Sequence, residues 1–369
     1  MIKVSVIGAS GYSGIYLLYA LSSRPDVSIS AITSQTYYGK KLLEVFPQFT
    51  KTCSKHNSIS ELKFSAFDPD VIAGSSDALF FCLPHNESSK LIPDILKKNS
   101  KIKIIDVGAD FRFDNLETYE EFYGKHNASE LNSKFIYGLS DIFLGKIKNS
   151  RFVANPGCYP TGALLPLLPL VFNGAVDFSF PVIIDSLSGI SGAGRGVKLP
   201  NLFCEVEGSV KVYNAWSHRH FPEIKEKITD AFLNSAGSSN NDNNMDMPNI
   251  LFTPHVIPVI RGILTTIYIK LKSGMLEKNI LEIYKEFYDK SPFVSILKNI
   301  EDCNIKNVIY SNNCHIAFET GKKENSGMVK IISAIDNLGK GASLQAVQNM
   351  NLMSGLEPDY GIPAYSPFP

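Results

Sequence analysis

Short apolar runs alternate with helix-length segments over the first 110 residues of the chain. The runs typical of strands are IKVSVIG, VSISAIT, ALFFCLP and KIIDVGA, and the segments with helical length are GIYLLYALSS and SSKLIPDILKK. Such alternation favours right-handed crossovers and a parallel sheet with helices on both faces. We therefore predict an α/β fold whose first domain, residues 1–154, is a doubly wound, nucleotide-binding domain.

The pattern changes after about residue 154. Longer strand candidates appear, PVIIDSLSG, ILFTPHVIPV and GILTTIYIKL, with one clear helix, EKNILEIYKEFYDK. Many strands with few crossovers predict an α+β second domain, residues 155–333, with a mostly antiparallel sheet. The polar, Asn/Ser-rich stretch 234–249 predicts a flexible loop.

Residues 336–355 read as a Gly-rich turn followed by a helix that Gly355 closes. We expect segment 334–369 to complete the first domain, an assignment that rests partly on the resemblance described below.

Length and charge indicate which kinds of partner the protein has. The 369 residues exceed the usual size of one core, and 36 basic residues balance 36 acidic ones without a block of like charge. This argues against nucleic-acid or membrane partners and favours a small-molecule substrate. The longest apolar run, near 162–176, is interrupted by prolines and too short to cross a bilayer.

The cysteines and the N-terminus predict the compartment. Six scattered cysteines include no Cys-x-x-Cys pair, which favours neither a disulfide framework nor a zinc ribbon. The N-terminus shows no charged region or cleavage site of a signal peptide. We therefore expect a cytoplasmic protein.

The motif GASGYSG lies between the first predicted strand and the first predicted helix. Its glycines, Gly8, Gly11 and Gly14, allow a tight turn and leave room for a pyrophosphate at the helix N-terminus. The spacing G-x-x-G-x-x-G differs from the commoner dinucleotide form, so a plain strand-to-helix turn stays open from this motif alone.

The end of the second predicted strand bears on cofactor choice. A carboxylate there would bind a ribose 2′-hydroxyl and repel a 2′-phosphate. This chain has Thr33, Ser34 and Gln35 instead, with Lys40 and Lys41 close behind. The sequence therefore favours NADP over NAD.

Cys158 follows Asn155-Pro156-Gly157 and precedes an apolar run of helical length. At a helix N-terminus the dipole favours a thiolate, and unpaired N–H groups can hold an oxyanion. A buried cysteine packed as a small hydrophobe is the other interpretation. The local sequence leaves both open.

His218 and His220 flank Arg219 in SHRHFPEI. If this piece is extended, both imidazoles point to one side, where they would serve one pocket with the cysteine. A thiol and a histidine are the groups that covalent acyl transfer requires. His-x-His also occurs in zinc sites, but no matching ligand spacing accompanies it, so we expect no metal.

His85 lies in FCLPH at the end of a predicted strand, where doubly wound sheets bind cofactors. It either lines that cleft or reacts. Arg112 and Arg195 lie in loops beside glycines, and Arg261 is a third candidate; a guanidinium there binds a carboxylate or phosphate, or forms a surface ion pair.

Eight segments in order carry a resemblance to a known family: GASGYSG, FCLPH, GADFR, ANPGCYPT, SGAGR, HRHFPEI, RGIL and DNLGKGA. The chain resembles the N-acetyl-gamma-glutamyl-phosphate reductase family, arginine-biosynthesis enzymes within the aspartate-semialdehyde dehydrogenase group. The resemblance implies NADPH-dependent reduction of an acyl phosphate through a cysteinyl thioester. It also implies a homodimer or homotetramer.

Residue roles follow from this resemblance. Catalysis is assigned to Cys158 and His220, with His218 assisting or positioning. Substrate binding is assigned to Arg112, Arg195, Asn155 and Ser188. Cofactor binding is assigned to Gly8, Ser10, Gly11, Tyr12, Ser13, Gly14, Thr33, Ser34, Cys82, Pro84, His85 and Asn337.

The chain departs from the family at Asn86, where glycine is usual, and at Phe113, where leucine is usual. Asn86 bears on the cofactor wall rather than on the chemistry. Two alternatives stay open: a related reductase acting on aspartyl or carrier-linked aminoadipyl phosphate, and a non-catalytic redox sensor that binds NADP.

Overall fold

The computed structural model describes residues 1–49, 59–235, 247–363 and 365–367, and most of the expected loop 234–249 lies outside them. The chain divides into two compact units. Unit 1 comprises Met1–Gly157 and Ala342–Ile362, and unit 2 comprises Cys158–Gly341 and Pro363–Pro369. Residues 334–341 and those after Ile362 thus cluster with unit 2, whereas we expected the whole of 334–369 in the first domain.

A seven-stranded parallel sheet forms the centre of unit 1, in the order β3-β2-β1-β4-β5-β7-β6. The strands are β1 (Ile2–Ile7), β2 (Val27–Thr33), β3 (Phe64–Ser65), β4 (Ala78–Phe81), β5 (Lys103–Asp106), β6 (Ile136–Tyr137) and β7 (Phe152–Ala154). Every strand pair is parallel. Buried apolar side chains fill β1 and β4, as expected of strands covered on both faces.

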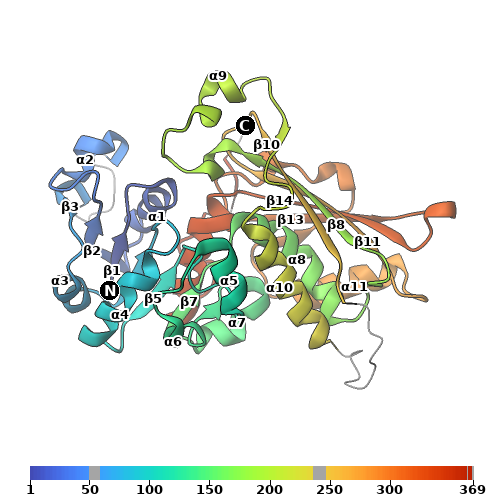
Figure 1. Cartoon of the computed structure of the whole chain (residues 1–369), viewed down its shortest axis with the longest axis horizontal. Coiled ribbons are helices and arrows are strands. Elements are labelled where there is room, and N and C mark those ends of the chain that lie inside the picture. The colour runs from blue at the N-terminus through green and yellow to red at the C-terminus, as the bar shows by residue number, and fades with distance from the viewer. Residues whose placement is uncertain (50–58, 236–246, 364, 368–369) are drawn as a thin grey trace. The chain divides into compact units, whose positions relative to one another are not determined.

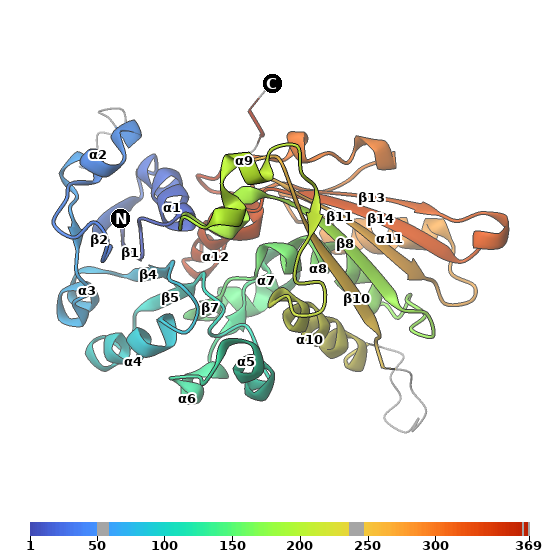
Figure 2. The same ribbon diagram turned by 45° about the horizontal axis from the view of Figure 1, so that its top comes forward.

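Helices cover both faces of this sheet (Figures 1 and 2). They are α1 (Tyr12–Ser22), α2 (Leu42–Val45), α3 (Pro69–Ser75), α4 (Ser88–Lys98), α5 (Leu116–Tyr123), α6 (Ser129–Asn132), α7 (Ser140–Lys148) and α12 (Leu344–Met353). Helices α1 and α12 lie on one face, and α3 and α4 on the other. The predicted doubly wound domain is confirmed.

Helix α12 is buried along its whole length, although it carries four amide side chains. Asn351 accepts a hydrogen bond from the Arg24 guanidinium at 2.6 Å. Asn349 donates to the carbonyl of Gly138 at 2.9 Å and accepts from the Ser140 hydroxyl at 2.8 Å. Because these buried amides find partners on α7 and its neighbours, the helix is fixed in one register.

Unit 2 is built on a second seven-stranded sheet, in the order β12-β13-β14-β11-β8-β10-β9. The strands are β8 (Val182–Gly189), β9 (Lys211–Val212), β10 (Ile250–Ile257), β11 (Ile263–Lys270), β12 (Val294–Ile296), β13 (Cys314–Thr320) and β14 (Met328–Ile335). Among the strand pairs of the described residues in this sheet, only β8 with β10 and β12 with β13 are parallel. The prediction of a mostly antiparallel sheet is confirmed.

The α-helices of the described part of unit 2 are α8 (Cys158–Phe172), α9 (Phe203–Val206), α10 (His220–Leu233) and α11 (Glu277–Tyr288). Helix α8 packs on β11 and β14, and α10 and α11 pack on α8 (Figure 1). Its residues from Tyr159 to Val171 are all buried, so the apolar run of the sequence is a core helix. Among the described residues, no helix has the length and apolar character to cross a membrane.

Two prolines inside α8 remove backbone donors, and hydroxyl groups replace them. Pro166 leaves the carbonyl of Gly162 without its helical partner, and Pro169 does the same to Leu165. Ser333 on β14 donates to the Gly162 carbonyl at 2.5 Å. Tyr288 on α11 donates to the Leu165 carbonyl. The helix therefore depends on two other elements of unit 2 for its own hydrogen bonding.

Candidate active site

The glycine turn of unit 1 connects β1 to α1 and requires glycine at two positions. Gly8 has a φ of +82°, and a Cβ there would lie 2.4 Å from the carbonyl oxygen of Cys82. A Cβ on Gly14 would lie 2.7 Å from the backbone of Ala9. Gly11 differs, because the nearest atom to its Cβ position is 3.9 Å away. Close backbone contacts explain why positions 8 and 14 are glycine. At Gly11 no such contact excludes a side chain.

Helix α1 begins at Tyr12 and has no side-chain cap, since its N-cap residue is Gly11. An uncapped helix start offers backbone N–H groups to an anion. The end of β2 is joined to the turn by hydroxyl groups: the Gly8 N–H donates to Thr33 at 3.1 Å, and the hydroxyls of Ser10 and Ser34 lie 2.8 Å apart. The turn, with Ser13 in its first helical residues, thus brings together the predicted cofactor residues of 8–14 and 33–34.

The FCLPH segment follows β4 and lies against the same turn through the Cys82 carbonyl. Burial raises the pKa of the Cys82 thiol, with the Asp106 carboxylate adding to the shift, so this cysteine is not a reactive one. Pro84 and His85 come next, and the His85 ring packs edge-on against Tyr123 with centroids 5.0 Å apart.

Asn86 adopts a φ of +66°, a left-handed conformation that favours glycine and tolerates asparagine. This explains physically why glycine suits the position in the family that the sequence resembles. The Asn86 side chain has its own contact, because its carbonyl oxygen accepts a hydrogen bond from Asn127 at 2.6 Å.

Two buried acids of unit 1 were not among the predicted site residues. Asp110 accepts the backbone N–H groups of Asn86 and Ser89 at 2.6 and 2.9 Å, so it caps the start of α4. Asp106 accepts from the Ser88 hydroxyl at 2.8 Å, and its other carboxylate oxygen has no hydrogen-bond partner among the described residues. Burial and the nearby Asp110 raise the pKa of Asp106 to about 7.

Arg112 and Asn155, both predicted to bind substrate, are buried in unit 1. The Arg112 guanidinium donates to the carbonyls of Asn155 and Val107 at 2.8 and 2.9 Å. The Asn155 side chain donates to the Ala342 carbonyl at 3.1 Å and accepts from Asn349 at 3.0 Å. These bonds hold the residues that precede Cys158.

Cys158 is the first residue of α8, as the sequence predicted for a helix-edge thiol. Its thiol is not in a disulfide, and the residue is half-buried. A Cβ on Gly341 would lie 2.8 Å from the Cβ of Cys158, so Gly341 leaves the room that the cysteine occupies. The placement at the helix start, with partial exposure, favours a reactive thiol over the buried alternative.

His218 and His220 come together, but not through an extended segment. Arg219 has a right-handed helical conformation, and His220 is the first residue of α10, so the conditional expectation of an extended piece is wrong. The rings approach because His218 Nδ1 accepts the backbone N–H of His220 at 3.1 Å. Their centroids are 5.1 Å apart.

Tyr213 connects His218 to Tyr159, the residue after the cysteine. The His218 Nε2 lies 3.2 Å from the Tyr213 hydroxyl, and Tyr213 donates to the Tyr159 hydroxyl at 3.0 Å. Tyr159 donates in turn to the carbonyl of His255 at 3.0 Å. The Tyr159 ring lies edge-on to both imidazoles, with centroids 5.2 Å from His218 and 5.8 Å from His220.

The remaining predicted residues of unit 2 divide by exposure. Ser188 is buried at the end of β8, where its hydroxyl also interacts with the Tyr159 phenol. Arg195 is exposed in the loop after β8. Asn337 is buried; it accepts the Gly262 N–H at 2.8 Å and donates to the Ser191 hydroxyl at 2.9 Å. Asn337 thus belongs to unit 2, whereas the other predicted cofactor residues belong to unit 1.

Arg261, the third arginine candidate, forms a buried ion pair with Asp336 at 2.8 Å. Its guanidinium also lies over the Tyr310 ring, 4.4 Å from the centroid. The ion pair is therefore buried and not on the surface, and substrate binding by Arg261 stays a prediction. Its partner Asp336 lies just before the Gly-rich segment that ends at Gly341.

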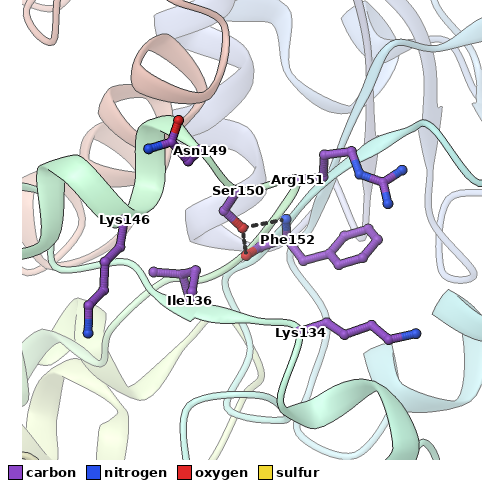
Figure 3. A pocket seen from close by; sticks show the side chains of 7 residues that line it. All are labelled: Lys134, Ile136, Lys146, Asn149, Ser150, Arg151 and Phe152. Carbon is purple, nitrogen blue, oxygen red and sulfur yellow. Dashed lines mark hydrogen bonds between the residues drawn. The ribbon is translucent and has the colours of Figure 1, made fainter.

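A pocket of about 450 Å³ opens elsewhere in unit 1 and contains none of the predicted site residues. It is lined by Lys134, Ile136, Lys146, Asn149, Ser150, Arg151 and Phe152 (Figure 3). Figure 3 shows the charged end of Lys146 on the opposite side of the view from those of Lys134 and Arg151. Because these cations do not converge, we assign the pocket no ligand.

Comparison with known proteins identifies the family to which the chain belongs. Residues 3–150 match the family model described as semialdehyde dehydrogenase, NAD binding domain, and residues 158–337 match semialdehyde dehydrogenase, dimerisation domain. N-acetyl-gamma-glutamyl-phosphate reductase from Thermoanaerobacter pseudethanolicus is 39% identical over 97% of this chain and 96% of its own. The Pelotomaculum thermopropionicum protein of the same name is 41% identical over 98% and 97%.

The chain belongs to the N-acetyl-gamma-glutamyl-phosphate reductase family. Its fold is that of the semialdehyde dehydrogenases: the structure of aspartate semialdehyde dehydrogenase with NADP from Candida albicans superposes with a TM-score of 0.64. That structure shares 13% sequence identity and covers 96% of this chain and 100% of its own. The resemblance seen in the sequence is confirmed, and unit 2 of this reductase-family chain carries the dimerisation domain.

Sequence reasoning did not single out four residues that contact predicted site residues or their chain neighbours: Asp106 and Asp110 in unit 1, and Tyr159 and Tyr213 in unit 2. Tyr159 and Asp110 lie inside the quoted motifs ANPGCYPT and GADFR, so their positions were visible but their bonds were not. Tyr213 lies outside every quoted motif, and only the fold brings it to Tyr159.

Proposed function

We propose that this protein uses NADPH to reduce N-acetyl-L-glutamyl 5-phosphate to N-acetyl-L-glutamate 5-semialdehyde and phosphate, a step of arginine biosynthesis. The observation that carries the proposal is the placement of Cys158 and His220 as the first residues of α8 and α10, two helices that pack together. A nucleophile and a proton-transferring group on rigid, adjacent elements are what acyl transfer requires.

The residues of unit 1 fit an NADP molecule. The uncapped start of α1 supplies N–H groups for the pyrophosphate, and Gly11 leaves space for it. Thr33 and Ser34 present hydroxyls at the end of β2, where a carboxylate would repel a 2′-phosphate. We assign the pyrophosphate to the backbone of residues 8–14, and the nicotinamide side to Cys82, Pro84 and His85. When bound, NADPH supplies the hydride.

Cys158 carries the covalent chemistry in this proposal. Its thiolate adds to the acyl carbon, the bond from that carbon to the phosphate oxygen breaks, and phosphate leaves with the electron pair. A thioester remains on the cysteine. After reduction the carbon–sulfur bond breaks, the aldehyde departs, and the thiolate is restored. N–H groups at the start of α8 stabilise the oxygen that gains negative charge in each addition.

His220 moves the proton. It takes the proton of the Cys158 thiol when the thiolate forms and returns it as the thiol is restored. Ser188 and Arg195 bind the substrate, the arginine by its charge. Substrate binding by Arg112 and Asn155 stays a prediction; their observed bonds support a positioning role for the residues before Cys158.

The two units divide the work. Unit 1, completed by α12, holds the cofactor, and unit 2 provides catalysis and oligomerisation. Its family match to a dimerisation domain supports a homo-oligomer, and we propose a homodimer or homotetramer in the cytoplasm. Analytical ultracentrifugation distinguishes these assemblies from each other and from a monomer of 40.7 kDa.

The reverse reaction tests the function. Purified protein with N-acetyl-L-glutamate 5-semialdehyde, phosphate and NADP should produce NADPH, followed by absorbance, and omission of phosphate should abolish it. Cys158→Ser should lower kcat by at least about a thousandfold. Cys204→Ser, which changes an exposed free cysteine of the same unit, is the matched control. Full activity of Cys158→Ser would exclude the covalent route.

The alternatives give different results in the same assay. Comparing kcat/KM for the aspartate, N-acetyl-glutamate and carrier-linked aminoadipate semialdehydes identifies the acyl group. A redox sensor would bind NADP, show no phosphate-dependent turnover, and have a Cys158 that iodoacetamide modifies no faster than Cys204.

A further inference from the structure

The hydrogen bonds around His218 form a chain in which each donor can be assigned. The last acceptor is the carbonyl of His255, which cannot donate, so the Tyr159 hydroxyl must use its only proton there. Tyr159 therefore accepts the bond from Tyr213, whose proton is then also used. The Tyr213 oxygen has only acceptor capacity left for His218 Nε2, 3.2 Å away.

The other nitrogen of His218 is fixed by the backbone. The N–H of His220 can only donate, so His218 Nδ1 must accept at 3.1 Å and carries no proton. Both ends of the imidazole are thereby determined: Nε2 bears the hydrogen and Nδ1 bears a lone pair. Protonation of Nδ1 would break the bond to His220 and set two N–H groups against each other.

We propose that His218 is held as the neutral Nε2–H tautomer by the Tyr159–Tyr213 hydroxyl chain and acts as a positioning residue for His220, which alone of the two histidines transfers the proton. The role in the reaction rests on the proposed function. The tautomer itself does not, because it follows from the bonds alone.

The surroundings of His218 favour the neutral ring. Burial and the adjacent Arg219 guanidinium lower the pKa of His218 to about 4. The other groups that face it are Tyr159, Tyr213, His220 and the apolar ring of Phe252. No carboxylate is among these described neighbours, so nothing there stabilises an imidazolium.

The hydrogen-bond chain around His218 also explains how the starts of α8 and α10 are held together. Tyr159 belongs to the first turn of α8, His255 lies on β10, and Tyr213 and His218 lie in the segment between β9 and α10. The four bonds therefore connect the helix that begins with Cys158 to the helix that begins with His220. Loss of one hydroxyl releases the His218 ring and, through it, the backbone at His220.

Nitrogen-15 NMR of histidine-labelled protein without ligand tests the tautomer, with the His218 signals assigned by their loss in His218→Asn. We expect an Nε2–H pattern that does not change between pH 6 and pH 8. An Nδ1–H pattern, or titration within that range, would overturn the proposal. In Tyr213→Phe the His218 signal should shift toward a mixture of tautomers. Tyr284→Phe, which removes another buried hydroxyl of unit 2, should leave it unchanged.

Kinetics test the roles. His218→Asn retains a carbonyl oxygen that can accept the His220 N–H, so kcat should fall by only about tenfold and the pH profile should keep its form. His220→Asn should lower kcat by about a hundredfold or more and remove the corresponding limb of that profile. The opposite pattern would show that His218 transfers the proton. If the assay shows no turnover but NMR gives the expected tautomer, the proposed function fails and the tautomer assignment stands.

Discussion

The candidate site of unit 1 is formed mainly by backbone groups, whereas that of unit 2 is formed by side chains. In unit 1 the cofactor turn depends on missing side chains: Gly8 and Gly14 allow close backbone contacts, and Gly11 leaves space at an uncapped helix start. In unit 2 the site depends on side chains joined to one another, from His218 through Tyr213 to Tyr159. A backbone site is local in sequence, whereas a side-chain site needs residues that only the fold assembles.

The largest expected effect tests the backbone half of this comparison. Gly8→Ala places a Cβ 2.4 Å from the Cys82 carbonyl in a left-handed conformation. It should lower the free energy of unfolding by about 4 kcal/mol or more and abolish NADPH binding. Urea denaturation and cofactor fluorescence measure the two effects. Gly74→Ala is the control, because its Cβ meets nothing within 4 Å. Normal cofactor affinity in Gly8→Ala would contradict the assignment of the turn.

Asp106 is a side chain of unit 1 whose ionisation, and not the backbone, affects stability. Its pKa of about 7 in the folded protein exceeds its value near 4 in an unfolded chain. Between these values the folded state binds more protons, so the free energy of unfolding falls as pH rises toward 7 and is level above it. Asp106→Asn removes this loss and should stabilise the protein at pH 8 by on the order of 2 to 3 kcal/mol.

Urea unfolding at pH 5 and pH 8 measures the Asp106 effect. Asp177→Asn serves as the opposite control. Hydrogen bonds from Ser179 and Lys270 lower the pKa of Asp177, so the stability it contributes is lost as pH falls. Equal pH dependence of wild type and Asp106→Asn would show that Asp106 is ionised at no cost in the folded protein.

The hydroxyls that complete α8 give the next largest effect. Tyr288→Phe leaves the Leu165 carbonyl, already deprived of a partner by Pro169, without its donor. The free energy of unfolding should fall by about 1 to 2 kcal/mol. Tyr268→Phe, on a partly exposed position of β11, is the matched control and should change little. A Tyr288→Phe protein as stable as wild type would mean that the proline-freed carbonyl is satisfied in another way.

The smallest expected effect concerns cofactor choice. Ser34→Asp introduces a carboxylate just after β2, where it would repel a 2′-phosphate and accept a ribose hydroxyl. The affinity for NADP should fall roughly tenfold, about 1.4 kcal/mol, while that for NAD rises. Titrations with both cofactors measure this. Ser65→Asp on the neighbouring strand is the control for added charge. Unchanged selectivity would place the 2′-phosphate elsewhere.

Much of unit 1 was predictable because its signals are short-range. The alternation of apolar runs fixed the parallel sheet, and GASGYSG marked the turn that the structure places between β1 and α1. The positive φ of Asn86 was not predictable from one sequence, since asparagine adopts either backbone conformation. The hydrogen bonds of Arg112 and Asn155 were also out of reach, because these partners lie on segments distant in the chain.

Unit 2 was less predictable because its contacts join residues that are far apart in the sequence. Cys158 at a helix start follows from Pro156-Gly157 and the apolar run, but the approach of His218 to His220 does not follow from strand periodicity, which assumed an extended segment. The hydroxyl chain joins positions 159, 213 and 255, and no local pattern links them. Cofactor binding by Asn337 stays a prediction, and its bonds to Gly262 and Ser191 within unit 2 were not predictable from its motif.

The prolines of α8 also bear on how the protein is made. A helix with two internal prolines has little stability in isolation, and Ser333, which completes its hydrogen bonding, lies 171 residues beyond Gly162. A chain still emerging from the ribosome has no β14 to complete that helix. The complete hydrogen bonding of the helix that begins at Cys158 therefore forms only after nearly the whole protein has been synthesised.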